Sequence, residues 1–380
     1  MRFIKILFTW LLLASSVSAV AAEGRPVVSL NGQWQLSFWK QPAKVVRSPE
    51  AMGGVNLKTI SATVPGNVEI DLQKAGLIAD PMVGNNVNDL RRWEGYEWCY
   101  SKQFATPQLQ GDERLQLWFG GIDCLADIWL NGKHIGSAEN MMIEHAFDVT
   151  DVVKPAGANN TLQVIIRSSV LEAQQHLLGT FSIGGFASEE SSYIRKAPHA
   201  FGWDIMPRLV SAGLWKNVEL RVINPVRFRD VHYYISEIDT ATRNVQLFAD
   251  VQVAMPLEHF DHVTARLTLS RQGKVAYTME KPVVTQAFRC MWSLDHADLW
   301  WPRGYGEQAL YDVKAELIDK TGKVLAENKQ RIGLRTVKLD LNDMNTADNP
   351  GRFRFYVNGE PIFIHGTNWV PLDALHSRDT

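Results

Sequence analysis

The sequence predicts an all-β protein in which two β-sandwich domains follow one another. From Val27 onward, short runs rich in aliphatic and aromatic residues are separated by turn residues, at roughly the 8–12-residue spacing that is typical of sandwiches. The best-specified element is Asp127–Gly136, two alternating runs joined by Asn131-Gly132. This dipeptide tolerates positive φ and therefore predicts a tight hairpin turn.

Composition excludes several classes of partner. The 39 Lys and Arg residues balance 41 Asp and Glu residues, and no basic run occurs, so neither nucleic acid nor an anionic membrane is expected as the main partner. Three cysteines, Cys99, Cys124 and Cys290, allow at most one disulfide within the chain. No residue spacing suggests a metal, and no glycine-rich phosphate loop is present, so we expect neither metal nor cofactor.

Residues 1–22 have the pattern of a secretory signal peptide. Arg2 and Lys5 precede an apolar run from Ile6 to Ala14, and small residues follow it. This run is too short for a stable membrane span, and no later stretch reaches about 18 uninterrupted apolar residues. We therefore expect export without a membrane span, to the periplasm, the cell exterior or, in a eukaryote, the lysosome.

Turn residues divide the mature chain into three parts. The first β domain is predicted over 23–224 and ends at Asn224-Pro225. Alternating strands over 225–333 have the size and pattern of an immunoglobulin-like sandwich. A third piece, 334–380, contains a second hairpin signal at Asn358-Gly359.

The strongest functional signal lies between Arg195 and Arg208. This stretch mixes cations, aromatics, a carboxylate, Gly and Pro and fits neither helical nor strand periodicity, which predicts a loop. Trp203 beside Asp204 suits a sugar, because an aromatic face covers the apolar side of a pyranose while a carboxylate accepts hydrogen bonds from hydroxyls. In the structural alternative, Trp203 fills the end of a sandwich and Asp204 pairs with Arg208 or Arg195.

The residues Phe201-Gly202-Trp203-Asp204 and Pro207-Arg208 resemble the Gly-Trp-Asp-Trp-Gly-Pro-Arg loop of the β-mannosidases. These enzymes belong to the glycoside hydrolase family (family two) that also holds β-galactosidases and β-glucuronidases. The chain departs from their pattern at Ile205-Met206. The resemblance implies that Trp203 and Asp204 bind the terminal sugar of a β-mannoside oligosaccharide or glycoconjugate.

Further motifs extend the resemblance over nearly all of the mature chain. In the first domain they imply a sugar-binding jelly roll, and in the second they imply a core turn. The matching segments are Val64-Pro65-Gly66, Glu97-Trp98-x-Tyr100, Gly120-Gly121-Ile122-Asp123, Ala126–Gly132 and Leu299–Gly306. We interpret Arg91, Arg92 and Trp93, another group of charged and aromatic residues, as structural.

The last residues resemble the first strand of the family's (β/α)₈ barrel. Ile362–Ile364, followed by Gly-Thr-Asn-Trp-Val-Pro, carries the resemblance, with His365 where Lys or Arg is more common. It implies that Asn368 and Trp369 lie at the carboxyl end of a barrel strand, where such barrels do chemistry. A barrel takes about 250 residues, so we expect 334–380 to be a truncated start, with an unpaired, mobile apolar tail from about Phe353.

Retaining glycosidases use two carboxylates, and in the resembled family both are Glu residues on later barrel strands. We therefore assign no catalytic residue to this chain. The main hypothesis is the amino-terminal, non-catalytic part of an exported retaining exo-β-mannosidase, inactive alone. The alternatives are a free-standing secreted carbohydrate-binding protein, or the same architecture with β-galactosidase, β-glucuronidase or β-glucosaminidase specificity.

The signal peptide makes a direct prediction. The exported protein should begin near Ala22 or Glu23, because the small residues after the apolar run suit a signal peptidase. Amino-terminal sequencing of the exported protein checks this, and recovery of Met1 would refute it.

Overall fold

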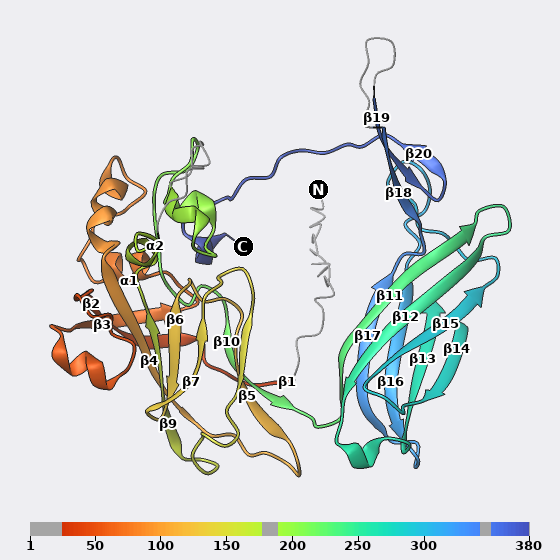
Figure 1. The fold of residues 1–380 in the computed structure, drawn as a ribbon, viewed down its shortest axis with the longest axis horizontal. Coiled ribbons are helices and arrows are strands. Elements are labelled where there is room, and N and C mark those ends of the chain that lie inside the picture. The colour runs from red at the N-terminus through yellow and green to blue at the C-terminus, as the bar shows by residue number, and fades with distance from the viewer. Residues whose placement is uncertain (1–24, 177–188, 343–350, 380) are drawn as a thin grey trace, which may run out of the picture. The chain divides into compact units, whose positions relative to one another are not determined.

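The computed structural model describes residues 25–176, 189–342 and 351–379, and these form an all-β fold with short helices (Figure 1). The predicted all-β class is therefore confirmed, whereas the expected start of a barrel stays a prediction. The chain forms two compact units, one made of Gly24–Asn224 with Thr367–Thr380 and the other of Pro225–Gly366. The predicted signal peptide, residues 1–22, lies outside the described residues.

The first unit is a sandwich of two antiparallel sheets within the described residues. The larger sheet has the strand order β3-β2-β4-β9-β6-β7, and the smaller has the order β1-β10-β5-β8. The larger sheet contains β2 (Gly32–Lys40), β3 (Lys58–Val64), β4 (Tyr96–Ala105), β6 (Ala126–Leu130), β7 (Lys133–Ala138) and β9 (Asn159–Ile166). The smaller sheet contains β1 (Arg25–Ser29), β5 (Arg114–Phe119), β8 (His145–Asp148) and β10 (Val218–Ile223).

One apolar core fills the space between these sheets. On β5, Leu115, Leu117 and Phe119 are fully buried, whereas Trp118 between them is partly exposed. The buried row packs in the same core as Leu36 of the opposite sheet. Side chains alternate across a strand, so these three residues mark the core face of β5.

Short helices lie in the connections of the first unit. They are η1 (Glu50–Gly54), α1 (Val68–Lys74), η2 (Asn86–Trp93), α2 (Ser169–Ala173), η3 (Glu189–Ser192) and η4 (Pro198–Phe201). Figure 1 shows α1, α2 and the last residues of the chain at the same end of this sandwich. None of the helices in the described part of the chain has the length and apolar character needed to cross a bilayer.

The second unit is also a sandwich. Its sheets have the orders β11-β12-β15 and β14-β13-β16-β17, and one apolar core lies between them. The elements are β11 (Arg227–Asp239), β12 (Asn244–Ala254), η5 (Leu257–His259), β13 (Val263–Arg271), β14 (Lys274–Pro282), β15 (Ala287–Leu294), β16 (Tyr311–Asp319) and β17 (Val324–Ile332). This arrangement agrees with the predicted immunoglobulin-like sandwich.

Both predicted hairpin turns are present. Asn131 and Gly132 have φ of 54° and 78° between β6 and β7, and Asn358 and Gly359 have φ of 51° and 81° between β19 (Arg352–Val357) and β20 (Glu360–Ile362). Only residues that tolerate the left-handed region fit such positions at low cost.

The end of the chain corrects the expectation of an unpaired tail. β19 pairs with β18 (Val337–Asn342) and with β20, so the backbone near Phe353 has strand partners. The strand expected from Ile362 to Ile364 stops at Ile362, and residues 363–371 have no regular secondary structure. Beyond them, Ala374 and Leu375 are buried in the core of the first unit.

The three cysteines are buried and free. Burial raises the pKa of the Cys99 and Cys124 thiols to about 12, because the interior disfavours a thiolate. These two side chains therefore act as small apolar groups at neutral pH.

Candidate functional site

The stretch from Arg195 to Arg208 is a loop, as predicted, interrupted by η4. Its tip is a tight turn in which the Trp203 N–H donates to the Met206 carbonyl at 3.0 Å and the Met206 N–H donates to the Trp203 carbonyl at 3.3 Å. Gly202 precedes this turn with φ of 106°, which favours glycine. The turn therefore fixes the direction in which the tip leaves the sandwich.

The tip presents Trp203 and Asp204 at the surface. The Trp203 side chain is 38% exposed, and Asp204 is also exposed. Neither side chain forms a hydrogen bond or an ion pair with another described residue. The structural alternative required Trp203 to be buried and Asp204 to pair with Arg208 or Arg195, so this part of the structure does not favour it.

Arg208 holds the carboxyl-terminal end of the loop. Its Nε and Nη2 donate to the two carboxylate oxygens of Glu94 at 2.8 and 2.9 Å, and its Nη1 donates to Glu190 at 2.7 Å. The guanidinium also lies 5.7 Å from the centroid of the Phe201 ring. Hydrogen bonds to Glu94 raise the pKa of Arg208 above its usual range. A bidentate pair of this kind fixes orientation as well as distance.

Lys196 holds the amino-terminal end of the loop. Its side chain and that of Asp123 are both fully buried, and its ammonium lies 2.5 Å from both Asp123 oxygens. The same ammonium donates to the Ser211 carbonyl at 2.8 Å. The backbone of Asp123, between β5 and β6, is in turn hydrogen-bonded in both directions to Gly213, at 2.8 and 3.1 Å. Both ends of the loop are thus bound to the sandwich through charged side chains.

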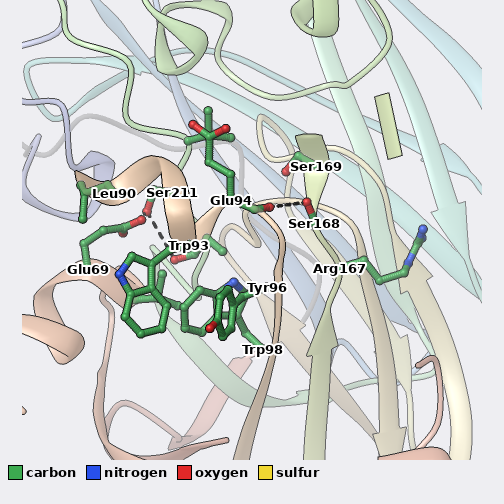
Figure 2. Close-up of a pocket in the computed structure, with 13 residues that line it drawn as sticks. Glu69, Leu90, Trp93, Glu94, Tyr96, Trp98, Arg167, Ser168, Ser169 and Ser211 are labelled. Atoms are coloured by element: carbon green, nitrogen blue, oxygen red, sulfur yellow. Dashed lines mark hydrogen bonds between the residues drawn. The ribbon is translucent and has the colours of Figure 1, made fainter. Parts of the chain in front are cut away.

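A small cavity of about 20 Å³ is lined in part by Glu94 and Ser211, which bind Arg208 and Lys196 respectively (Figure 2). It is lined by Glu69 of α1, Trp93 of η2, Tyr96 and Trp98 of β4, and Ser211, among others. Its volume is sufficient for one water molecule. It is too small for a sugar ring, so this cavity is not a substrate pocket.

Glu69 is a buried carboxyl group in this cavity wall. Its Oε2 accepts a hydrogen bond of 2.6 Å from the Ser211 hydroxyl, and Ser211 in turn accepts one of 2.8 Å from the Asn67 amide. Desolvation by burial raises the pKa of Glu69 to about 7. The indole N–H of Trp93 is buried and has no hydrogen-bond partner among the described residues.

Trp93 packs in a cluster of aromatic rings. Its ring lies 4.8 Å from that of Tyr96, 5.7 Å from that of Phe38 and 6.2 Å from that of Trp98, measured between centroids. Tilted and edge-on arrangements at these distances are favourable for aromatic pairs. The cluster supports η2, whose last turn leads to Glu94 and hence to the Arg208 anchor.

The other predicted pair, Asn368 and Trp369, is exposed, with Trp369 79% accessible. Both residues precede a short helix, η6 (His376–Arg378), and belong to the same compact unit as the loop. Within the described residues, no hydrogen bond or ion pair joins this pair directly to Trp203 or Asp204. The segment is instead fixed by its later residues.

Sequence reasoning missed the anchors of the loop. Lys196 and Arg208 stand in the stretch that it singled out, but their partners Asp123 and Glu94 lie 73 and 114 positions away. No spacing rule links residues at such separations. Among the described residues, no cluster of His, Cys, Asp and Glu could hold a metal ion.

Comparison with protein families identifies both sandwiches. Residues 37–216 match the family model described as "Glycosyl hydrolase 2 galactose-binding domain-like", and residues 226–335 match "Glycosyl hydrolases family 2". Both descriptions name the same family of glycosidases. The resemblance carried by the sequence motifs is thereby confirmed.

Similar proteins include several β-mannosidases. That of Mus musculus is 29% identical over 97% of this chain and 41% of its own length, and β-mannosidase B of Thermothelomyces thermophilus is 32% identical over 83% and 36%. The crystal structure of β-D-mannosidase from Dictyoglomus thermophilum is 30% identical, with a TM-score of 0.76, and the match covers 92% of this chain and 41% of that one. The chain therefore spans about two fifths of these relatives.

A β-glucuronidase structure from Bifidobacterium dentium shares the fold. Its TM-score is 0.59 at 21% identity, over 88% of this chain and 50% of that chain. This match supports the two-sandwich architecture.

The buried Lys196–Asp123 pair makes a stability prediction. Lys196→Met should destabilise the first unit by about 3–5 kcal/mol, because it leaves a buried carboxylate without its partner. Denaturant unfolding of the purified chain measures this, with exposed Lys133→Met as the control that should change little.

A double variant tests the cause. Adding Asp123→Leu to Lys196→Met should recover much of the lost stability, since an apolar pair needs no charge compensation. A double variant less stable than Lys196→Met alone would contradict this account.

Proposed function

The chain belongs to glycosyl hydrolase family 2, and from this premise we propose that it forms the amino-terminal, non-catalytic part of an exported retaining exo-β-mannosidase. The proposed substrate is a terminal β-D-mannose on an oligosaccharide or glycoconjugate. The β-mannosidases among its relatives, at 29–32% identity, support this assignment. The signal-peptide pattern of residues 1–22 supports export.

The anchored loop is the observation that carries the proposal. Trp203 and Asp204 stand exposed at its tip, while Lys196 and Arg208 are bound at its two ends. A tip held in this way loses little conformational freedom when it binds a ligand. An indole face and a free carboxylate together suit the apolar and hydroxyl sides of one sugar ring.

Asn368 and Trp369 supply the same two kinds of group on a second segment. An amide both donates and accepts hydrogen bonds, and an exposed indole offers a second stacking surface. We assign all four residues to substrate binding and none to catalysis. In the resembled family, the two catalytic Glu residues come from later barrel strands, and a retaining mechanism needs both.

The charges near the loop and the similar proteins both bear on the identity of the sugar. A glucuronide carries a carboxylate and would need an available cation. Arg208 and Lys196 are instead occupied by Glu94, Glu190 and Asp123. These two cations are therefore unavailable to a charged sugar, whereas Arg195 of the same loop is exposed. The β-mannosidases among the relatives support mannose.

Asp204→Ala in the full-length enzyme should lower kcat/KM on an aryl β-mannoside about 10- to 100-fold. The reason is the loss of hydrogen bonds between a charged group and the sugar, each worth about 1.5–3 kcal/mol. The melting temperature should stay almost unchanged, because Asp204 is exposed. Asp112→Ala, at another exposed Asp, is the control and should change neither quantity. A large loss of stability with ordinary turnover would instead mean a structural role for Asp204.

Residues 23–380 alone should not hydrolyse β-mannosides. A general acid–base group and a nucleophile accelerate hydrolysis by many orders of magnitude. The proposal places both of these groups outside residues 23–380. An assay of the purified fragment on an aryl β-mannoside measures this. Hydrolysis that survives purification and disappears in Asp204→Ala would show that a catalytic pair lies within these residues. If the fragment binds a sugar by itself, that result would instead favour a free-standing carbohydrate-binding protein.

A further inference from the structure

The segment that carries Asn368 and Trp369 is bound to the first unit by the residues that follow it. Leu375 is buried in the apolar core of that unit. The Ser377 N–H donates to the Asn67 side-chain carbonyl at 3.0 Å. Through the amide of Asn67, this contact connects to the buried Ser211 and Glu69.

His376 is the titratable residue at the centre of this contact. It is only 6% exposed, and its ring lies 5.1 Å from that of His199 and 6.0 Å from that of Trp215. Its Nε2 is buried and has no hydrogen-bond partner among the described residues. The ring is therefore packed as an uncharged aromatic group.

His199 belongs to η4, inside the loop that presents Trp203 and Asp204. The contact between the two imidazoles thus joins the loop to the segment of Asn368 and Trp369. On the premise of the function proposed above, we propose that His376 is a positioning residue. Its uncharged ring holds this segment against the loop through His199, and the contact is lost when the ring becomes protonated.

The groups around His376 disfavour a positive charge there. The pKa of His376 is lowered to about 4, chiefly by burial; Asp123 and Asp379 raise it, and Lys196 and His199 lower it. Asp123 is already paired with Lys196. On the same segment, Arg378 is paired with Asp373 at 2.6 Å. Burial also lowers the pKa of His199, so the second ring of the contact likewise disfavours a positive charge.

The lowered pKa of His376 determines how the binding of residues 371–379 to the first unit, here called docking, depends on pH. A free imidazole has a pKa of 6.5, against about 4 in the docked segment, so the released form binds protons more readily. Docking is therefore fully favoured above pH 6.5 and is lost progressively as the pH falls toward 4. Between pH 7.5 and pH 5.0 the docking equilibrium should weaken about thirtyfold.

Amide hydrogen exchange on the 380-residue chain tests the docking without any sugar. After correction for intrinsic exchange rates, peptides covering 371–379 should lose about thirtyfold in protection between pH 7.5 and pH 5.0. His376→Phe should keep the protection at both pH values, because Phe fills the same space and cannot be protonated. His376→Leu is a second apolar variant, and exposed His365→Phe, in the other unit, should leave the pH response intact.

Two results would overturn the docking: equal protection of the wild-type segment at both pH values, or an unchanged pH response in both apolar variants. The full-length enzyme tests positioning separately, because KM for an aryl β-mannoside should rise on acidification in the wild type and rise less in His376→Phe. An identical rise in both proteins would overturn positioning. Failure of the full-length enzyme to hydrolyse any β-mannoside would overturn the proposed function alone, since the exchange result does not depend on it.

Discussion

The buried ion pair between Lys196 and Asp123 is the constraint on which the candidate site depends. Neither side chain is accessible, so each charge has lost its hydration and depends on the other for compensation. The Ser211 carbonyl accepts a further hydrogen bond from Lys196. The pair joins the start of the loop to the connection between β5 and β6. A loop anchored at this point cannot move away from the sandwich without exposing an unpaired buried charge.

The second anchor works differently. Arg208 is partly accessible and is held by Glu94, which directly follows η2, and by Glu190 of η3. A bidentate contact at such a place contributes direction more than stability. The buried Lys196 pair and the bidentate Arg208 contact hold the two ends of the loop. The turn between Trp203 and Met206 remains as its exposed part. The loop therefore presents an indole and a carboxylate without needing regular secondary structure.

Local chemistry made much of the fold predictable from the sequence. The turns at Asn131-Gly132 and Asn358-Gly359 require positive φ, and strand alternation marks which face is buried. The loop tip was also predicted, because Trp203-Asp204 is a contiguous signal. The anchors of the loop could not be predicted, because Asp123 and Glu94 become neighbours of the loop only after the sheets have formed. The prediction of an unpaired tail was wrong near Phe353 for the same reason, because strand partners such as β18 are set by tertiary structure.

The polar interior of the first unit connects these features into one arrangement. Glu69 bonds to Ser211, Ser211 to Asn67, and Asn67 to the backbone of Ser377, while the Ser211 carbonyl also receives Lys196. Buried polar groups are costly unless every member has a partner, so a change at one member disturbs the others. The loop and the final segment therefore share one set of supports. This shared interior therefore holds the loop and the final segment in a fixed relation to the same sandwich.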